Sequence, residues 1–183
     1  MIYTTKELLS NGETEYSIRQ KLKQNSLYLV ERGFYSDKKD EVINSEVFIS
    51  KKYPNAIITN LSAFYLYGLT DYIPDYHYLA TEQHSFPIRN SNVKQSYQEA
   101  SFFEVGVTNL KINEGYAKTY DRERLLIELF RLKEKYPAEI YYDVLNSFRK
   151  IKGDLDFYKV NSYLKFFKNG NNILKKIRDY IWC

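Results

Sequence analysis

The chain has 183 residues, 44% of them hydrophobic, which suits one compact domain or a small module joined to a larger one. No apolar run approaches the roughly 20 residues needed to span a bilayer, and the single cysteine, Cys183, excludes an internal disulfide framework. We therefore expect a cytoplasmic protein with no membrane partner. The formal net charge is +4, and the basic excess falls mostly in residues 116–183. That region could present a phosphate-facing surface or a solvated lysine-rich face.

The first part of the chain predicts two helices followed by a hairpin. Thr4 and Glu7 have the spacing of a capping box, which would begin the first helix. A second helix fits residues 14–25, and the β-prone residues 26–35, which flank Gly33, predict a short hairpin. Two helices joined by a tight turn and followed by a hairpin make a winged helix-turn-helix.

The middle of the chain predicts a small mixed sheet after a polar linker at residues 37–45. A helix or an extended segment begins at Val47, and Asn113-Glu114-Gly115 is a good hairpin turn. We expect strands at 56–59, 76–81, 102–107, 110–112 and 116–120, a helix at 61–67, and a loop at 82–95.

The last third of the chain predicts about four helices. Asp121 would cap the first of them, and Arg122 and Arg124 would form salt bridges or face phosphate. The helices fit residues 121–134, 138–150, 156–168 and 172–182. The predicted fold is therefore α+β, with a winged helix-turn-helix at 1–45 and a domain of sheet plus helices at 46–183.

Few residues suggest catalysis or metal binding. His77, His84 and the remote Cys183 lack the spacing of a zinc site, and no cofactor motif is present. Asp154 and Asp156 form an Asp-x-Asp pair that could hold divalent metal in nucleotidyl transfer. Because the pair lies between two predicted helices, Asp156 is also a natural N-cap. We expect neither catalytic residues nor a bound metal, and the chain is not expected to be an enzyme.

The polar face of the second helix is the best candidate for DNA recognition. Glutamines on a helix can pair with adenine edges in the major groove, while lysines and arginines meet phosphates. The predicted DNA-binding residues lie on this helix, at the wing tip and just after the wing: Tyr16, Ser17, Arg19, Gln20, Lys21, Lys23, Gln24, Arg32, Lys38 and Lys39. A polar helix face in a purely structural lobe is the alternative.

Three segments resemble the AbiEi-type antitoxins of type IV, abortive-infection toxin–antitoxin systems. Residues 4–35, with the wing Arg32-Gly33-Phe34-Tyr35, look like the family's N-terminal winged helix. Residues 59–71 are similar to its Ser-Ala-x-x-x-x-Gly-Leu segment, with Tyr67 where histidine is common. Residues 120–126 look like its Glu-Arg-Thr-Leu helix start, with Leu125 where threonine is usual.

The resemblance implies a DNA-binding antitoxin that represses its own operon and opposes a nucleotidyltransferase toxin encoded beside it. Its partners would be operator DNA upstream of that operon and, functionally, the toxin, without required contact. The family often carries a helix before the segment that begins here at Met1. Because about 45 residues bury little surface alone, residues 1–45 must lean on the middle domain or tolerate a small core, and we expect close docking.

Two other functions fit the sequence. The many tyrosines and phenylalanines, 19 and 11, could form a surface that neutralises a toxin by direct contact. A nuclease or nucleotidyltransferase would use Asp154 and Asp156, and a position between two helices would remove that possibility.

Overall fold

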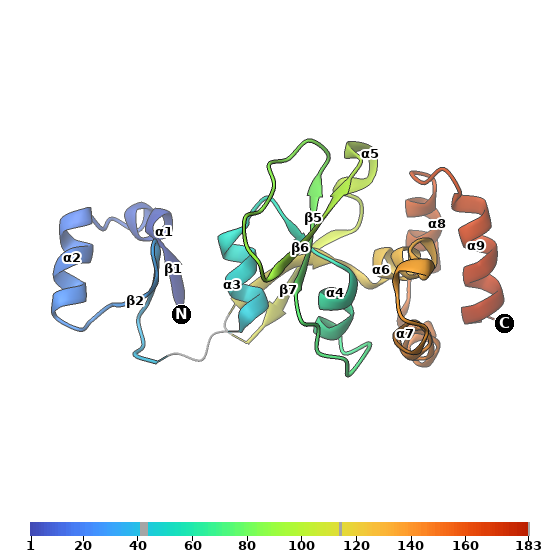
Figure 1. Cartoon of the computed structure of the whole chain (residues 1–183), viewed down its shortest axis with the longest axis horizontal. Coiled ribbons are helices and arrows are strands. Elements are labelled where there is room, and N and C mark those ends of the chain that lie inside the picture. The colour runs from blue at the N-terminus through green and yellow to red at the C-terminus, as the bar shows by residue number, and fades with distance from the viewer. Residues whose placement is uncertain (41–43, 114, 183) are drawn as a thin grey trace. The chain divides into compact units, whose positions relative to one another are not determined.

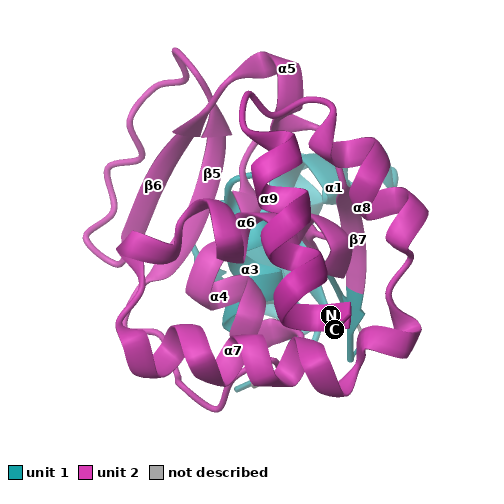
Figure 2. Cartoon of the chain, turned by 90° about the vertical axis from the view of Figure 1, so that its right-hand side faces the viewer, with its two compact units in different colours: residues 1–53, 111–117 teal, residues 54–110, 118–183 magenta. Residues whose placement is uncertain are grey.

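The computed structural model describes residues 1–40, 44–113 and 115–182. The chain forms two compact units, residues 1–53 with 111–117, and residues 54–110 with 118–183 (Figure 2). The described residues contain a three-stranded and a five-stranded sheet together with helices, which confirms the α+β prediction. The sequence predicted a domain boundary after residue 45, whereas the first unit of the structure runs to residue 53 and includes residues 111–117. Part of the predicted linker, residues 41–43, lies outside the described residues.

The first unit begins with a winged helix-turn-helix, as predicted. Its strands form an antiparallel sheet in the order β1-β3-β2. The three-residue strand β1 was not predicted, because its pairing of Ile2 with Ser36 is a long-range contact that leaves no local pattern. The elements are β1 Ile2–Thr4, α1 Thr5–Ser10, α2 Glu15–Lys23, β2 Tyr28–Glu31, β3 Phe34–Ser36 and α3 Ser45–Lys52.

Side-chain caps define where the first two helices begin. At α1, the Glu7 amide donates to Thr4 Oγ1 at 3.1 Å and the Thr4 amide donates to Glu7 Oε2 at 2.7 Å. At α2, Thr14 and Ser17 exchange the corresponding bonds at 3.1 and 2.8 Å. The capping box predicted at Thr4 is therefore confirmed, and a second one orients α2.

The core of the winged helix is small. Leu8, Ile18 and Leu27 are its buried cluster, and Tyr3, Leu22 and Tyr35 pack against it. Helix α3 belongs to the same unit and is linked to the winged helix by a Phe34–Phe48 ring contact, with centroids 5.1 Å apart. Lys51 and Lys52 of α3 also pair with Glu7 and Glu31, at 2.7 and 2.5 Å. Helix α3, which the prediction assigned to the domain after residue 45, therefore packs closely on the winged helix.

The five-stranded sheet has the order β6-β5-β4-β8-β7. Strand β4 pairs antiparallel with β5 and parallel with β8, and β5 pairs parallel with β6. The sheet and its short helices are β4 Ile57–Ile58, α4 Asn60–Leu66, β5 His77–Glu82, β6 Val93–Gln98, α5 Ala100–Phe103, β7 Val107–Ile112 and β8 Gly115–Tyr120. Within the hairpin turn predicted at residues 113–115, Glu114 lies outside the described residues.

Two predictions in this region were wrong. Residues 82–95 are not all loop, because β6 begins at Val93 and pairs with β5 over six residues despite its polar sequence. Residues 102–107 are not one strand, because Phe102 and Phe103 belong to the helical turn α5 and are buried there. In both places tertiary pairing and burial override the local pattern.

Four α-helices follow the sheet in the described chain, as predicted (Figure 1). Helix α6 contacts α7, α8 and α9, so it is the centre of this helical part. Asp121 caps α6 by accepting from the Arg124 amide at 2.9 Å. The helices are α6 Arg122–Arg131, α7 Ala138–Lys150, α8 Phe157–Leu164 and α9 Gly170–Ile177, which continues as a π-helical turn at Arg178–Trp182. None of the helices in the described part has the length and apolar character required to cross a bilayer.

Candidate nucleic-acid interface

One face of α2 carries five of the residues predicted to bind DNA. Tyr16, Arg19, Gln20, Lys23 and Gln24 follow the i, i+3, i+4, i+7, i+8 spacing that places side chains along a single helix face. All except the half-buried Gln20 are exposed, and Tyr16 keeps 71% of its surface. Ile18 lies on the opposite side, in the core. The helix is therefore anchored through one face and presents a polar, cationic one to solvent.

Ser17 and Lys21 have local partners instead. The Ser17 hydroxyl donates to Glu13 Oε2 at 2.6 Å and caps the helix, and the Lys21 ammonium pairs with Glu13 Oε1. These bonds from Lys21 and Ser17 lower the pKa of Glu13 below its usual value. Any contact that Ser17 or Lys21 made with DNA would compete with this arrangement at the turn before α2.

The wing is fixed to the start of α1. The Gly33 carbonyl accepts from the Thr5 amide at 2.9 Å and from the Thr5 hydroxyl at 3.3 Å. Gly33 has φ +85°, a conformation that glycine adopts without steric cost, and it lets the chain reverse next to Arg32. Arg32 is exposed at this tip, and Lys38 and Lys39 are exposed after β3. The sequence did not reveal Thr5 as the residue that holds the wing, because the bond joins positions 28 apart.

Ion pairs neutralise the acidic side chains around this face. Glu15 lies 3.6 Å from Arg19, and Glu13 and Glu31 pair with Lys21 and Lys52. Lys23, Arg32 and Lys39 have no ion-pair partner among the described residues. The remaining electrostatic character of the exposed α2 face and wing tip is therefore positive.

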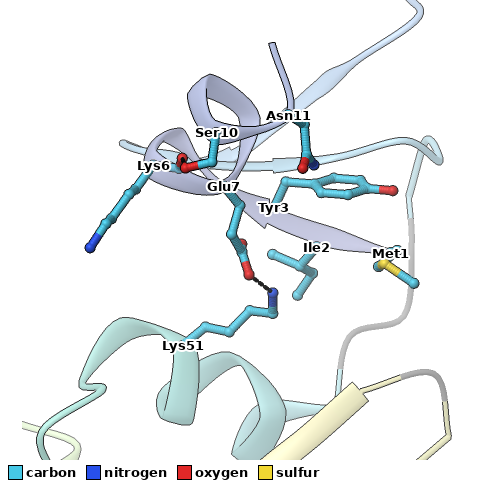
Figure 3. A pocket seen from close by; sticks show the side chains of 8 residues that line it. All are labelled: Met1, Ile2, Tyr3, Lys6, Glu7, Ser10, Asn11 and Lys51. Carbon is cyan, nitrogen blue, oxygen red and sulfur yellow. Dashed lines mark hydrogen bonds and ion pairs between the residues drawn. The ribbon is translucent and has the colours of Figure 1, made fainter. Parts of the chain in front are cut away.

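A shallow hollow lies on the α1 side of the same unit (Figure 3). Glu7 and Lys51 meet across it, while the amino group of Met1 pairs with Asp37. Partial burial raises the pKa of Glu7, but hydrogen bonds from Lys51 and Thr4 outweigh this effect and hold the pKa below its usual value. None of the α2 residues lines this hollow. Its charges serve to join α3 to α1.

The Asp-x-Asp pair lies between two helices, as the sequence predicted. Asp154 ends a short 3₁₀ helix, and Asp156 caps α8 by accepting from the amides of Tyr158 and Lys159 at 2.9 and 3.1 Å. The capping interpretation of Asp156 is therefore confirmed. Across the ranges that the structure describes, no three His, Cys, Asp or Glu side chains are grouped so as to hold a metal ion.

Of the two roles expected for Arg124, a salt bridge or a contact with phosphate, the structure shows the salt bridge. It is fully buried and pairs with Glu128, with Nη2 and Oε1 2.8 Å apart. Arg122 instead lies over the Tyr67 ring, 5.6 Å from its centroid. Burial, together with the nearby Asp121 carboxylate, raises the pKa of Tyr67 to about 12. Both arginines thus have structural partners inside the second unit.

The fold of the chain is similar to that of a known protein structure. No protein-family model and no curated protein matches the chain. Among solved structures, the chain is similar to the crystal structure of the RV2827C protein from Mycobacterium tuberculosis, with a TM-score of 0.57 and 12% sequence identity. The match covers 96% of this chain and 71% of that one. At this identity the likeness concerns the α+β fold, which extends over nearly all of the chain.

Proposed function

We propose that the chain is a DNA-binding antitoxin that represses its own operon and opposes a nucleotidyltransferase toxin. The observation that carries DNA binding is the row of exposed polar and cationic side chains on α2, the second helix of a winged helix-turn-helix. The antitoxin role rests on the resemblance to AbiEi-type antitoxins. In this proposal α2 enters the major groove of the operator, and Arg32 reaches the backbone or the minor groove.

The side chains of α2 would make two kinds of contact with DNA. Gln20 and Gln24 are one helical turn apart and can pair with base edges, while Arg19 and Lys23 can meet phosphates. Arg19 must leave Glu15 to do so, but that pair is exposed and therefore costs little to open.

The test is the binding of DNA from upstream of the chain's own gene, measured by fluorescence anisotropy across a salt series. We expect a specific complex whose affinity falls with salt, with a slope of about −0.9 per phosphate contacted. Gln20→Ala should relax specificity by about 1–3 kcal/mol, and Lys23→Ala should weaken binding to all sequences and reduce the slope by about one.

Lys6→Ala is the matched control, because Lys6 is an exposed lysine of the same unit that lies on α1. It should leave both affinity and slope nearly unchanged. Binding that is blind to sequence, or a specific complex that Gln20→Ala and Lys23→Ala leave intact, would contradict the placement of α2 in the major groove.

Direct contact with the toxin is the second candidate function. The second unit exposes large aromatic side chains, among them Phe86 at 94% and Tyr158 at 87% of their surface. Such residues are enriched at protein interfaces. Co-purification with the product of the neighbouring gene, lost on Phe86→Ala or Tyr158→Ala, would favour this function, and its absence would favour action through DNA.

A further inference from the structure

A hollow of about 310 Å³ opens within the second unit, beside α5, the end of α6 and the turn between α8 and α9. Its volume is at the lower end of the range for small-molecule sites, roughly 300–1,000 Å³. It lies entirely in the unit that does not contain α2. A ligand of this hollow would therefore bind at a site distinct from the α2 face that is proposed to recognise DNA.

Part of the wall of the hollow is aromatic. Phe102, Phe130, Phe166 and Phe167 line it together with charged and amide side chains. The rings of Phe102 and Phe167 lie 4.9 Å apart with an angle of 33° between their planes, and Phe166 keeps 52% of its surface exposed. Phe102 and Phe167 are buried, and the guanidinium groups of Arg124 and Arg131 lie over their rings, so the exposed ring of Phe166 is the one on which a flat apolar group can stack.

A buried ionic network next to the hollow carries an excess of positive charge. Glu128, which is fully buried, accepts from Arg124 Nε and Nη2 at 3.0 and 2.8 Å and from Arg131 Nε and Nη2 at 2.9 and 2.5 Å. One carboxylate thus pairs with two guanidinium groups, which leaves one positive charge unbalanced. Excess charge away from bulk water is costly, so an anion nearby would lower the free energy of the network.

Arg131 connects this network to the hollow. It lines the hollow, and its Nη2 also donates to Gln98 Oε1 at 3.2 Å. Its guanidinium also lies over the Phe102 and Phe167 rings, 5.6 and 5.9 Å from their centroids, while its Nη1 donates no hydrogen bond to a described residue and can donate to a ligand. The bonds to Glu128 and Gln98 keep the guanidinium in place, which reduces the entropy lost on binding.

Two lysines add to the positive charge. Lys168 and Lys176 line the hollow, and the only carboxylate among its lining residues is Glu99, which lies 3.9 Å from Lys168. Lys176 has no ion-pair partner in the described ranges. Three cations face one carboxylate, which suits a ligand that carries two negative charges.

We propose that this hollow binds a phosphate monoester attached to a flat aromatic group, the chemistry of a mononucleotide. The exposed Phe166 ring would stack on the flat group, and Arg131, Lys168 and Lys176 would hold the phosphate. A carboxylate with its single charge would balance the three cations less completely.

The test is isothermal titration calorimetry of the full chain with adenosine 5′-monophosphate, adenosine and inorganic phosphate, at one fixed low ionic strength. We expect saturable binding of the monophosphate at least about tenfold tighter than that of adenosine or phosphate alone, because only the monophosphate engages both the Phe166 ring and the cations. Lys176→Ala and Lys168→Ala should each weaken its binding at least about fivefold.

Lys175→Ala is the matched control, since Lys175 is the neighbouring exposed lysine of α9 and does not line the hollow. It should bind the monophosphate like the unchanged chain. No binding, binding no tighter than that of phosphate, or equal weakening by Lys175→Ala and Lys176→Ala would each overturn the proposal. Gln20→Ala and Lys23→Ala should leave monophosphate binding unchanged, so a failure of DNA recognition would not affect this result.

Discussion

The two units of the chain are stabilised in different ways. The winged helix has a buried cluster of three apolar residues, and capping boxes and exposed ion pairs support it. The second unit buries Phe64, Phe148 and many aliphatic side chains completely, and it also buries the pair of Arg124 and Glu128. The first unit is thus stabilised by many weak local interactions. The second is stabilised by a large apolar core and by a buried ion pair whose loss would cost much free energy of unfolding.

This difference fits the DNA-binding role that we propose for the first unit. A small module held by local bonds can present a helix face without a large core behind it. Trp182, the only tryptophan of the chain, packs its ring against Phe157 with centroids 5.1 Å apart, so its fluorescence reports the second unit alone. Hydrogen exchange of the amides of α1 and α2 reports the first unit. The two stabilities can therefore be measured separately.

The largest effect is expected from Glu128→Gln. The amide keeps the shape of the side chain but removes the charge that Arg124 and Arg131 share. We expect the free energy of unfolding of the second unit to fall by about 3–5 kcal/mol, because two buried or partly buried guanidinium groups lose their counter-ion. Urea unfolding followed by Trp182 fluorescence measures the loss.

Glu134→Gln is the control for this change. Glu134 lies in the 3₁₀ helix after α6 and is exposed, so its charge should contribute less than about 0.5 kcal/mol. If Glu128→Gln were as mild as Glu134→Gln, the Arg124–Glu128–Arg131 network could not be a main support of the second unit.

The next effect is expected from Ile18→Ala. It removes one of the three residues of the buried cluster in the winged helix, and such truncations cost about 2–5 kcal/mol. We expect the amides of α1 and α2 to lose protection from hydrogen exchange while the Trp182 transition keeps its midpoint. Tyr16→Ala, on the exposed face, should change neither. A shift of the Trp182 midpoint by Ile18→Ala would show instead that the two units unfold together.

The local signals of the chain were sufficient to predict the winged helix and most of the C-terminal helices. Thr4 with Glu7 marks α1, Asp121 marks α6, and Asp156 marks α8, because capping depends on residues close in sequence. Strand β6 was missed because its polar residues become a strand only by pairing with β5. Phe102 was placed in a strand because a β-prone sequence does not show that burial favours a helical turn.

The sequence was also sufficient to predict part of the candidate DNA-binding site. Helical periodicity placed Tyr16, Gln20, Lys23 and Gln24 on the side opposite Ile18. It could not show that Ser17 and Lys21 are engaged by Glu13, because Glu13 precedes the helix and contacts them through the geometry of the turn. The bond from Thr5 to Gly33 and the hollow beside Arg131 join distant segments, for which the sequence carries no local signal.

A smaller effect is expected from Thr14→Ala. The Thr14 hydroxyl accepts from the Ser17 amide, and loss of an N-cap bond typically costs about 1 kcal/mol. The cost should appear as faster hydrogen exchange in α2, with no change in the second unit. Thr14→Ser restores the oxygen and should restore the protection. Equal exchange in the alanine and serine variants would mean that the cap bond does not stabilise α2.

The smallest effect is expected from the ion pair between Glu7 and Lys51. The folded-state pKa of Glu7 lies below its usual value, so the pair stabilises the first unit above the unfolded pKa, 4.5, and the stabilisation is lost as pH falls through the folded value. Because Glu7 retains 45% side-chain exposure, solvent screening keeps the contribution below about 1 kcal/mol. Hydrogen exchange in α1, measured at pH 6 and pH 3.5 and corrected for intrinsic rates, should therefore show a smaller pH-dependent loss of protection in Glu7→Gln than in the unchanged chain. Equal pH dependence in both chains would remove Glu7 from the contacts that hold α3 to α1, and the ring contact of Phe34 with Phe48 would then be the main support of that junction.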